Sequence, residues 1–83
     1  MDKILVEVYI PASSQTYDVF IPAESKIWEV AYLLSNTMTE LTQGYFNATE
    51  NTVLCDRETG TIYSMNQTVE EVGLLHGAKL MLL

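Results

Sequence analysis

The residues that most often carry out catalysis are scarce in this chain. Cys55 is the one cysteine and His76 the one histidine among 83 residues. A nucleophilic device needs a thiol or hydroxyl beside a histidine base. However, His76 precedes Gly77 in a predicted turn, where an exposed polar residue is expected. Cys55 lies in an apolar run and is predicted to be a small core residue. The sequence therefore predicts that the protein is not an enzyme.

No combination of residues is typical of a metal or cofactor site. Metal sites need clustered His, Cys or carboxylate ligands. The neighbours Glu70 and Glu71, with one separate histidine, do not supply such a cluster. The sequence also lacks a glycine-rich phosphate loop. We expect neither a metal nor a cofactor.

The charge balance narrows the range of partners. Eleven acidic and four basic residues give a formal net charge of −7. Nucleic acids and anionic membrane surfaces are recognised through Lys and Arg clusters, and a membrane span needs a run of about 20 apolar residues. The sequence has neither feature, so we expect a cytoplasmic protein with no nucleic-acid partner and no membrane insertion. The acidity favours solubility or a basic protein partner.

Two alternating segments open the chain and predict a β-hairpin. Residues 3–10 and 16–21 place apolar side chains at every second position, which is the period of a strand with one buried face. The turn-type residues 11–15 join these two strands. Pro22 has no N–H to donate to a strand ladder and is expected to end the second strand.

The hydrophobic period then lengthens to that of an α-helix. The pattern predicts a helix over 26–36 that continues, frayed, through 37–42. Ser25 stands at the expected N-cap position, and Gly44 is the expected terminator. The apolar stripe of this helix comprises Ile27, Val30, Ala31, Leu34, Met38 and Leu41.

The second half of the chain is predicted to contain three short strands and one capped turn. Strands are expected at 52–56, 61–63 and 78–83, with a loop over 43–52 and a turn at 57–60. Thr68 and Glu71 have the spacing of a capping box, and Gly73 follows as a terminator. The segment 68–73 is therefore predicted to be a short helical turn.

These elements, in the order β-β-α-β-β-short helix-β, predict one α+β domain over residues 1–83. A hairpin, one amphipathic helix and further strands give a mixed sheet with the helix packed across one face. By fold analogy, the last strand should lie parallel to the first. The predicted core comprises Ile4, Val6, Val8, Ile10, Tyr17, Val19, Ile21, Leu80 and Leu82 from the sheet, and Ile27, Val30, Ala31 and Leu34 from the helix.

The element order resembles that of the ubiquitin superfamily, whose fold is the β-grasp. The segment 68–82 is similar to the short helix, turn and last strand of that superfamily. More narrowly, the strand 16–22 that leads into a helix, and a sequence that stops at its last strand, resemble the YukD/EsaB-like ubiquitin-like proteins of type VII (WXG100) secretion loci. The resemblance implies a non-conjugated, cytosolic accessory or regulatory component of a bacterial secretion system, which works by binding protein.

One departure from conjugated ubiquitins concerns the final residues. Conjugated ubiquitins and sulfur carriers resemble each other in a flexible tail that ends in Gly-Gly, whereas this sequence ends in Leu82 and Leu83. We therefore expect no conjugation or thiocarboxylate chemistry. Two alternatives stay open. The chain could be a modifier or sulfur-carrier protein with a processed or missing Gly-Gly tail, or an acidic inhibitor or antitoxin.

The sheet face opposite the helix is the best candidate for a binding site. An open sheet face is normally polar, but large apolar residues are expected on this one, and such patches usually mark contact sites. On the helix, Trp28 and Tyr32 lie off the main stripe, and they are expected either to form a second contact point or to cover the edge of the core. The predicted protein-binding patch, for a partner or a second copy of the chain, comprises Leu5, Phe20, Leu54, Met81 and Leu83.

Overall fold

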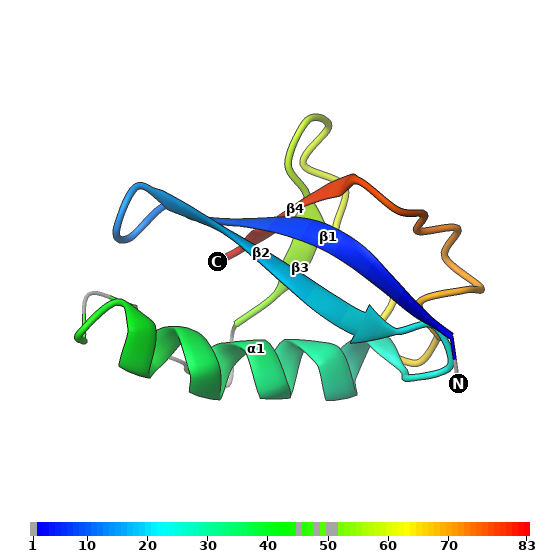
Figure 1. Cartoon of the computed structure of the whole chain (residues 1–83), viewed down its shortest axis with the longest axis horizontal. Helices are drawn as coiled ribbons and strands as arrows, with labels where there is room; N and C mark the ends of the chain where they lie inside the picture. Colours follow the sequence, from blue (N-terminus) through cyan, green and yellow to red (C-terminus); the bar gives the residue numbers. More distant parts are fainter. Residues whose placement is uncertain (1, 45, 48, 50–51) are drawn as a thin grey trace.

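Two long strands, one helix and two short strands form the described part of the structure. The computed structural model describes residues 2–44, 46, 47, 49 and 52–83. The elements are β1 (Lys3–Ile10), β2 (Gln15–Pro22), α1 (Ile27–Leu41), β3 (Leu54–Asp56) and β4 (Ala78–Leu82). Figure 1 shows α1 lying across one face of the sheet that the strands form.

The sheet has four strands in the order β2-β1-β4-β3. β2 pairs with β1 in the antiparallel sense, and so does β3 with β4. β4 lies parallel to β1, with Val8 opposite Leu80. This arrangement is the mixed sheet of an α+β, β-grasp fold, and it confirms the parallel placement of the last strand. A parallel pair needs a long connection between its strands, and here that connection contains α1.

The core lies between the sheet and α1, as the alternation predicted. The inward positions Val6, Val8 and Ile10 of β1 are almost fully buried. Leu41 is an exception to the predicted helical stripe, because its side chain is 52% exposed at the last residue of α1. Residues outside the predicted set complete the core. The buried apolar residues from β3 and the connecting segments are Phe46, Leu54, Cys55, Val69 and Leu74.

The start of α1 differs from the prediction by one residue. Lys26, not Ser25, is the N-cap residue, and its backbone is extended. The carboxylate of Glu29 accepts a hydrogen bond of 3.0 Å from the Lys26 N–H, which is one half of a capping box. The Ser25 carbonyl instead accepts a hydrogen bond of 2.9 Å from the Val69 N–H. The acidic side chain in the first turn therefore takes the role that the prediction gave to a serine hydroxyl.

The end of α1 is a Schellman motif. The Gln43 N–H bonds to the Glu40 carbonyl and the Gly44 N–H to the Thr39 carbonyl, each at 3.1 Å. Both Gln43 and Gly44 have positive φ, at 54° and 88°. The expected terminator Gly44 is thus part of the helix stop, but the first left-handed residue is a glutamine.

The segment 61–63 pairs back on β3 as predicted, through backbone bonds of 2.8 and 3.1 Å, but Ile62 and Cys55 form a single bridge there rather than a strand of the sheet. The capping box at 68–73 is confirmed. The Glu71 carboxylate accepts a bond of 2.9 Å from the Thr68 N–H, and the Thr68 hydroxyl accepts one of 3.0 Å from the Glu71 N–H. Within this segment the Val72 N–H bonds to the Thr68 carbonyl and closes a single turn. The segment is therefore one capped turn and not a regular helix.

Candidate functional site

The strand register defines which side chains share the sheet face that points away from α1, which we call the outer face. Leu5 on β1 lies opposite Phe20 on β2. Further along β1, Tyr9 lies opposite Met81 on β4. Residues directly opposite each other in a sheet share one face. The outer face therefore carries Leu5, Glu7, Tyr9, Thr16, Asp18, Phe20, Lys79 and Met81.

Leu54 does not belong to the outer face, which corrects the predicted patch. It lies opposite Leu82, and both side chains have no exposed surface. A strand of three residues is too short for its own alternation to show which side is buried. The partner strand decides this, since a shift of one residue exchanges the two faces. Leu54 is a core residue.

The other four predicted patch residues are accessible, and they form two groups. Leu5 and Phe20 are neighbours and are 37% and 66% exposed. Met81 is half-buried on β4, and Leu83, which follows the strand, is 51% exposed. A row of charged residues runs between the two groups. In this row Glu7 lies between Asp18 and Lys79.

Arg57 partly covers Tyr9, a contact that the sequence analysis did not predict. The guanidinium carbon of Arg57 lies 4.3 Å from the centre of the Tyr9 ring, a cation–π arrangement. The backbone N–H of Arg57 also bonds to the Lys79 carbonyl at 3.0 Å. Arg57 is therefore anchored beside β4 and places a positive charge on the outer face.

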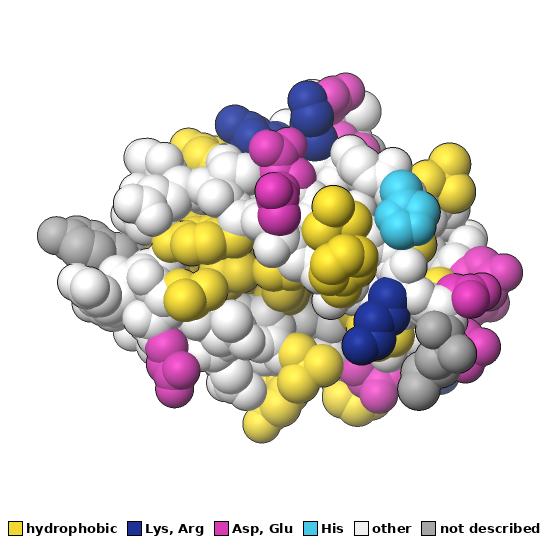
Figure 2. All heavy atoms as spheres, in the orientation of Figure 1, with side chains coloured by type: hydrophobic (Ala, Val, Ile, Leu, Met, Phe, Trp, Pro, Cys, Tyr) yellow, Lys and Arg dark blue, Asp and Glu magenta, His cyan; other side chains and the backbone are white. Residues whose placement is uncertain are grey.

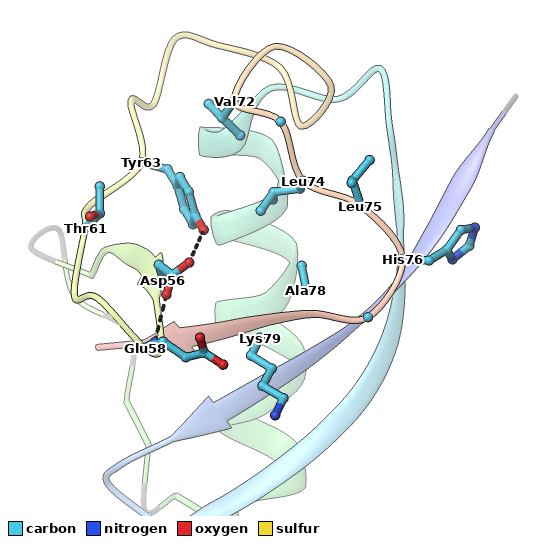
Figure 3. Close-up of a pocket in the computed structure, with 12 residues that line it drawn as sticks. Asp56, Glu58, Thr61, Tyr63, Val72, Leu74, Leu75, His76, Ala78 and Lys79 are labelled. Carbon is cyan, nitrogen blue, oxygen red and sulfur yellow. Dashed lines mark hydrogen bonds between the residues drawn. The ribbon is translucent and has the colours of Figure 1, made fainter.

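A network around Asp56 holds the hairpin that carries Arg57. One carboxylate oxygen accepts backbone bonds from Glu58 and Thr59 at 2.7 and 3.0 Å. Figure 3 shows the Tyr63 hydroxyl donating to the other oxygen, at 3.3 Å. The bonds from Thr59 and Glu58 lower the pKa of Asp56, and burial, followed by the Asp56 charge, raises the pKa of Tyr63 to about 12. The network is a structural one that fixes a turn.

Cys55 and His76 are not arranged for catalysis. Burial is the main cause that raises the pKa of the Cys55 thiol, and its side chain is almost fully buried. His76 stands in the turn before β4, and its Nδ1 accepts a hydrogen bond of 3.0 Å from the Leu5 N–H. In Figure 3 its ring points away from Asp56 and Tyr63. Among the described residues no three His, Cys, Asp or Glu side chains are grouped to hold a metal ion.

Trp28 and Tyr32 lie on the exposed side of α1, with 52% and 65% of their surfaces accessible. They line a shallow hollow together with Met65. The two rings thus add accessible apolar surface away from the outer face. In the described part of the chain, no helix has the length and apolar character needed to cross a membrane.

Comparison with solved structures identifies the fold as ubiquitin-like. The chain resembles the ubiquitin-like domain of EccD1, a type VII secretion protein of Mycobacterium tuberculosis, with a TM-score of 0.79 and 15% identity over 100% of this chain and 99% of that one. The EccD5 ubiquitin-like domain from Mycobacterium xenopi gives a TM-score of 0.82 and 18% identity over 100% and 94% of the two chains.

A third similar structure is a chain of the MycP5-free ESX-5 inner membrane complex, with a TM-score of 0.75 and 17% identity. The match covers 100% of this chain and 21% of that one. No protein-family model and no curated protein sequence matches the chain. At these identities the likeness establishes the fold.

Proposed function

We propose that the protein is a non-catalytic, non-conjugated protein-binding module that serves as a cytoplasmic accessory component of type VII secretion. The observation that carries this proposal is the end-to-end likeness to ubiquitin-like domains of two EccD proteins. A further similar chain belongs to a secretion-system inner membrane complex, so a binding role within such an assembly is the function that this likeness supports best.

The outer face supplies the contact surface in this proposal. Its accessible apolar residues are Leu5, Phe20 and Met81, and Leu83 extends this surface just beyond the end of β4. Burying large apolar side chains on an otherwise open sheet contributes about 1.5–3 kcal/mol for each one fully covered. The charged row between the two apolar groups can fix the orientation of a partner, since charges at a contact contribute more to specificity than to affinity.

The modifier alternative makes a distinct prediction. Both backbone groups of Leu83 bond to Val53, at 3.0 and 3.1 Å, so a tail that enters an activating enzyme would have to follow this residue. An intact mass of the protein from its native host that showed additional residues ending in Gly-Gly would favour the modifier alternative instead.

A capture experiment with matched variants tests the partner and the face together. Wild type, Leu83→Asp and Tyr32→Asp are used as baits in host lysate, and bound proteins are identified by mass spectrometry. We expect a type VII secretion component with wild type and Tyr32→Asp, and its loss with Leu83→Asp. Circular dichroism checks that all three baits are folded.

Two outcomes would contradict parts of the proposal. Capture of the same secretion component by Leu83→Asp would remove the outer face from the proposal. A partner set that contains no secretion component would remove the type VII context, whichever bait captures it.

A further inference from the structure

A shallow hollow of about 450 Å³ lies along one flank of α1, away from the outer face. The rings of Trp28 and Tyr32 line it from the helix, and Met65 lines it from the segment that follows β3. The two ring residues are 52% and 65% exposed. Figure 2, in the orientation of Figure 1, shows hydrophobic side chains reaching the surface along the lower edge of the molecule, where α1 runs. Both rings are therefore accessible to a partner.

The floor of the hollow is made of small side chains. Ala31 and Ser35 line it one helical turn apart, and each is 5% exposed. The Ser35 hydroxyl donates a hydrogen bond of 2.6 Å to the Ala31 carbonyl, so its proton is already used within the helix. On the opposite side, the Met65 carbonyl accepts a bond of 3.1 Å from the Trp28 N–H. This bond joins the two sides, so the hollow is formed before any ligand binds.

The hollow is uncharged, although the chain is strongly acidic. None of the described residues that line it carries a charge, whereas the chain as a whole has a formal net charge of −7. A charged side chain placed there would lose its water without gaining an opposite charge. In its charge, the hollow therefore complements an uncharged, apolar segment.

The backbone beside the hollow does not favour the addition of a strand. Among the described lining residues, the Trp28 N–H bonds to the Met65 carbonyl and the Thr52 N–H to the Thr49 carbonyl, each at 3.1 Å. The remaining wall is α1, whose backbone groups bond within the helix. A segment that binds here is expected to leave its own backbone in water or to satisfy it internally. A polyproline II helix meets the first condition, because its backbone is solvated and has no internal hydrogen bonds.

The spacing of the two rings also matches that conformation. Trp28 and Tyr32 are four residues apart, so their Cα atoms are separated by about 6 Å along the helix axis. Two residues of a polyproline II helix rise by about 6 Å as well. An α-helical segment is about 10 Å wide and docks through a longer apolar stripe than two rings provide.

Proline residues suit this surface chemically. A proline ring is apolar, and its nitrogen carries no N–H that would need a partner. Asn36 lies one further turn along the row that begins with Trp28 and Tyr32, and it also lines the hollow. Its exposed side-chain amide can donate to a backbone carbonyl of the segment.

We propose that the hollow beside Trp28 and Tyr32 binds a proline-rich segment of a partner protein in the polyproline II conformation. Prolines two positions apart contact the two rings, as in the aromatic-lined grooves that recognise such segments. The Asn36 amide donates a hydrogen bond to a carbonyl of the segment. This surface is separate from the outer face, so the failure of either contact leaves the other standing.

A decaproline peptide is the probe, and a Gly-Ser peptide of the same length is its control. Trp28 is the one tryptophan of the chain, so its indole N–H gives a single signal in a ¹⁵N NMR titration and reports on the hollow directly. Affinities are measured for wild type, Tyr32→Ala, Tyr32→Phe and Asn36→Ala, with Leu83→Asp as the control on another surface. Alanine is the best helix former and both helix positions are exposed, so the alanine variants should fold.

We expect decaproline, but not the Gly-Ser peptide, to shift the Trp28 indole signal and the nearby amide signals of α1. Tyr32→Ala should lower the affinity about tenfold or more, whereas Tyr32→Phe should keep it, because the ring makes the contact. Asn36→Ala should lower the affinity about threefold through the lost hydrogen bond. Leu83→Asp should bind as wild type does. Added salt should leave the affinity unchanged, since screening acts on charges.

Four results would overturn the proposal. Decaproline could bind no better than the Gly-Ser peptide, or it could bind Tyr32→Ala as tightly as wild type. Its affinity could fall with Leu83→Asp, which would assign the binding to the outer face. The Trp28 indole signal could instead shift as the protein concentration is raised without peptide, which would show that a second copy of the chain occupies the hollow.

Discussion

Leu54 on β3 lies directly opposite Leu82 on β4, and neither side chain has any exposed surface. β3 has only three residues, so its place in the sheet depends on this apolar pair and on its hydrogen bonds rather than on strand length. The same pairing holds the chain end, because the next residues outward, Val53 and Leu83, exchange two backbone hydrogen bonds. Packing at Leu54 therefore supports the edge of the sheet that carries the end of the sequence.

Truncation of Leu54 should be strongly destabilising. Leu54→Ala should lower the free energy of unfolding by about 2–5 kcal/mol, because it removes buried methyl groups and leaves a cavity. A domain of this size has on the order of 4–12 kcal/mol in total. Leu83→Ala, at a half-exposed site, is the matched control and should cost less than about 1 kcal/mol. Urea unfolding of both variants measures the difference, and equal losses would contradict the burial of Leu54.

A glycine at position 43 should stabilise the protein. Gln43 has φ of 54° at the end of α1, and a side chain in this conformation costs roughly 1–2 kcal/mol. Gln43→Gly should raise the free energy of unfolding by about 1 kcal/mol, after the entropy of the unfolded glycine is deducted. Gly44→Ala should lower it by a similar amount, even though a Cβ there has open space around it. Thermal unfolding of the pair tests the sign of each change.

The stability of the protein should fall in acid through two identified carboxylates. Hydrogen bonds from Thr59 and Glu58 lower the pKa of Asp56 below its ordinary 3.8, and bonds from Thr68 lower that of Glu71 below 4.5. As the pH falls toward these values, the unfolded chain binds more protons than the folded one. The stability that these carboxylates contribute is present above the ordinary values and is lost as the pH falls through the folded ones.

Removal of the two carboxyl groups should reduce the loss of stability in acid. The double variant Asp56→Asn, Glu71→Gln should show a smaller decrease in urea midpoint between neutral and acid pH than wild type, since amide side chains do not titrate. Glu40→Gln, at an exposed site on α1, serves as the control and should keep the wild-type slope. An unchanged slope in the double variant would contradict the assignment.

Tyr63 should contribute to a decrease in the stability of the protein at alkaline pH. Burial, together with the charge of Asp56, raises its pKa from 10.0 to about 12. Between these values the unfolded chain has lost the phenol proton while the folded one keeps it, so stability decreases as the pH rises. Tyr63→Phe should remove part of this decrease, whereas Tyr32→Phe, at a site 65% exposed, should not. Near-ultraviolet titration of tyrosinate should show a late ionisation in folded wild type that is absent from Tyr63→Phe.

The sequence by itself determined the features that depend on neighbours a few residues apart. The alternation of β1 and β2, the stripe of α1 and the capping box of Thr68 and Glu71 are all periodic or short-range patterns. They are present in the structure, except that Leu41 at the end of the stripe is exposed. They imply a sheet covered by one helix, because that is how such a hairpin and such a helix bury their apolar faces together.

Only the tertiary structure decided the features that need a partner from far along the chain. The side of the sheet on which Leu54 lies is fixed by Leu82, and the cover over Tyr9 comes from Arg57. The open edge of β2 follows from the pairing of β4 with β1. Alternation gives the period of a strand but not its phase or its neighbours, and those are set by the pairing that buries the most apolar surface across the whole sheet.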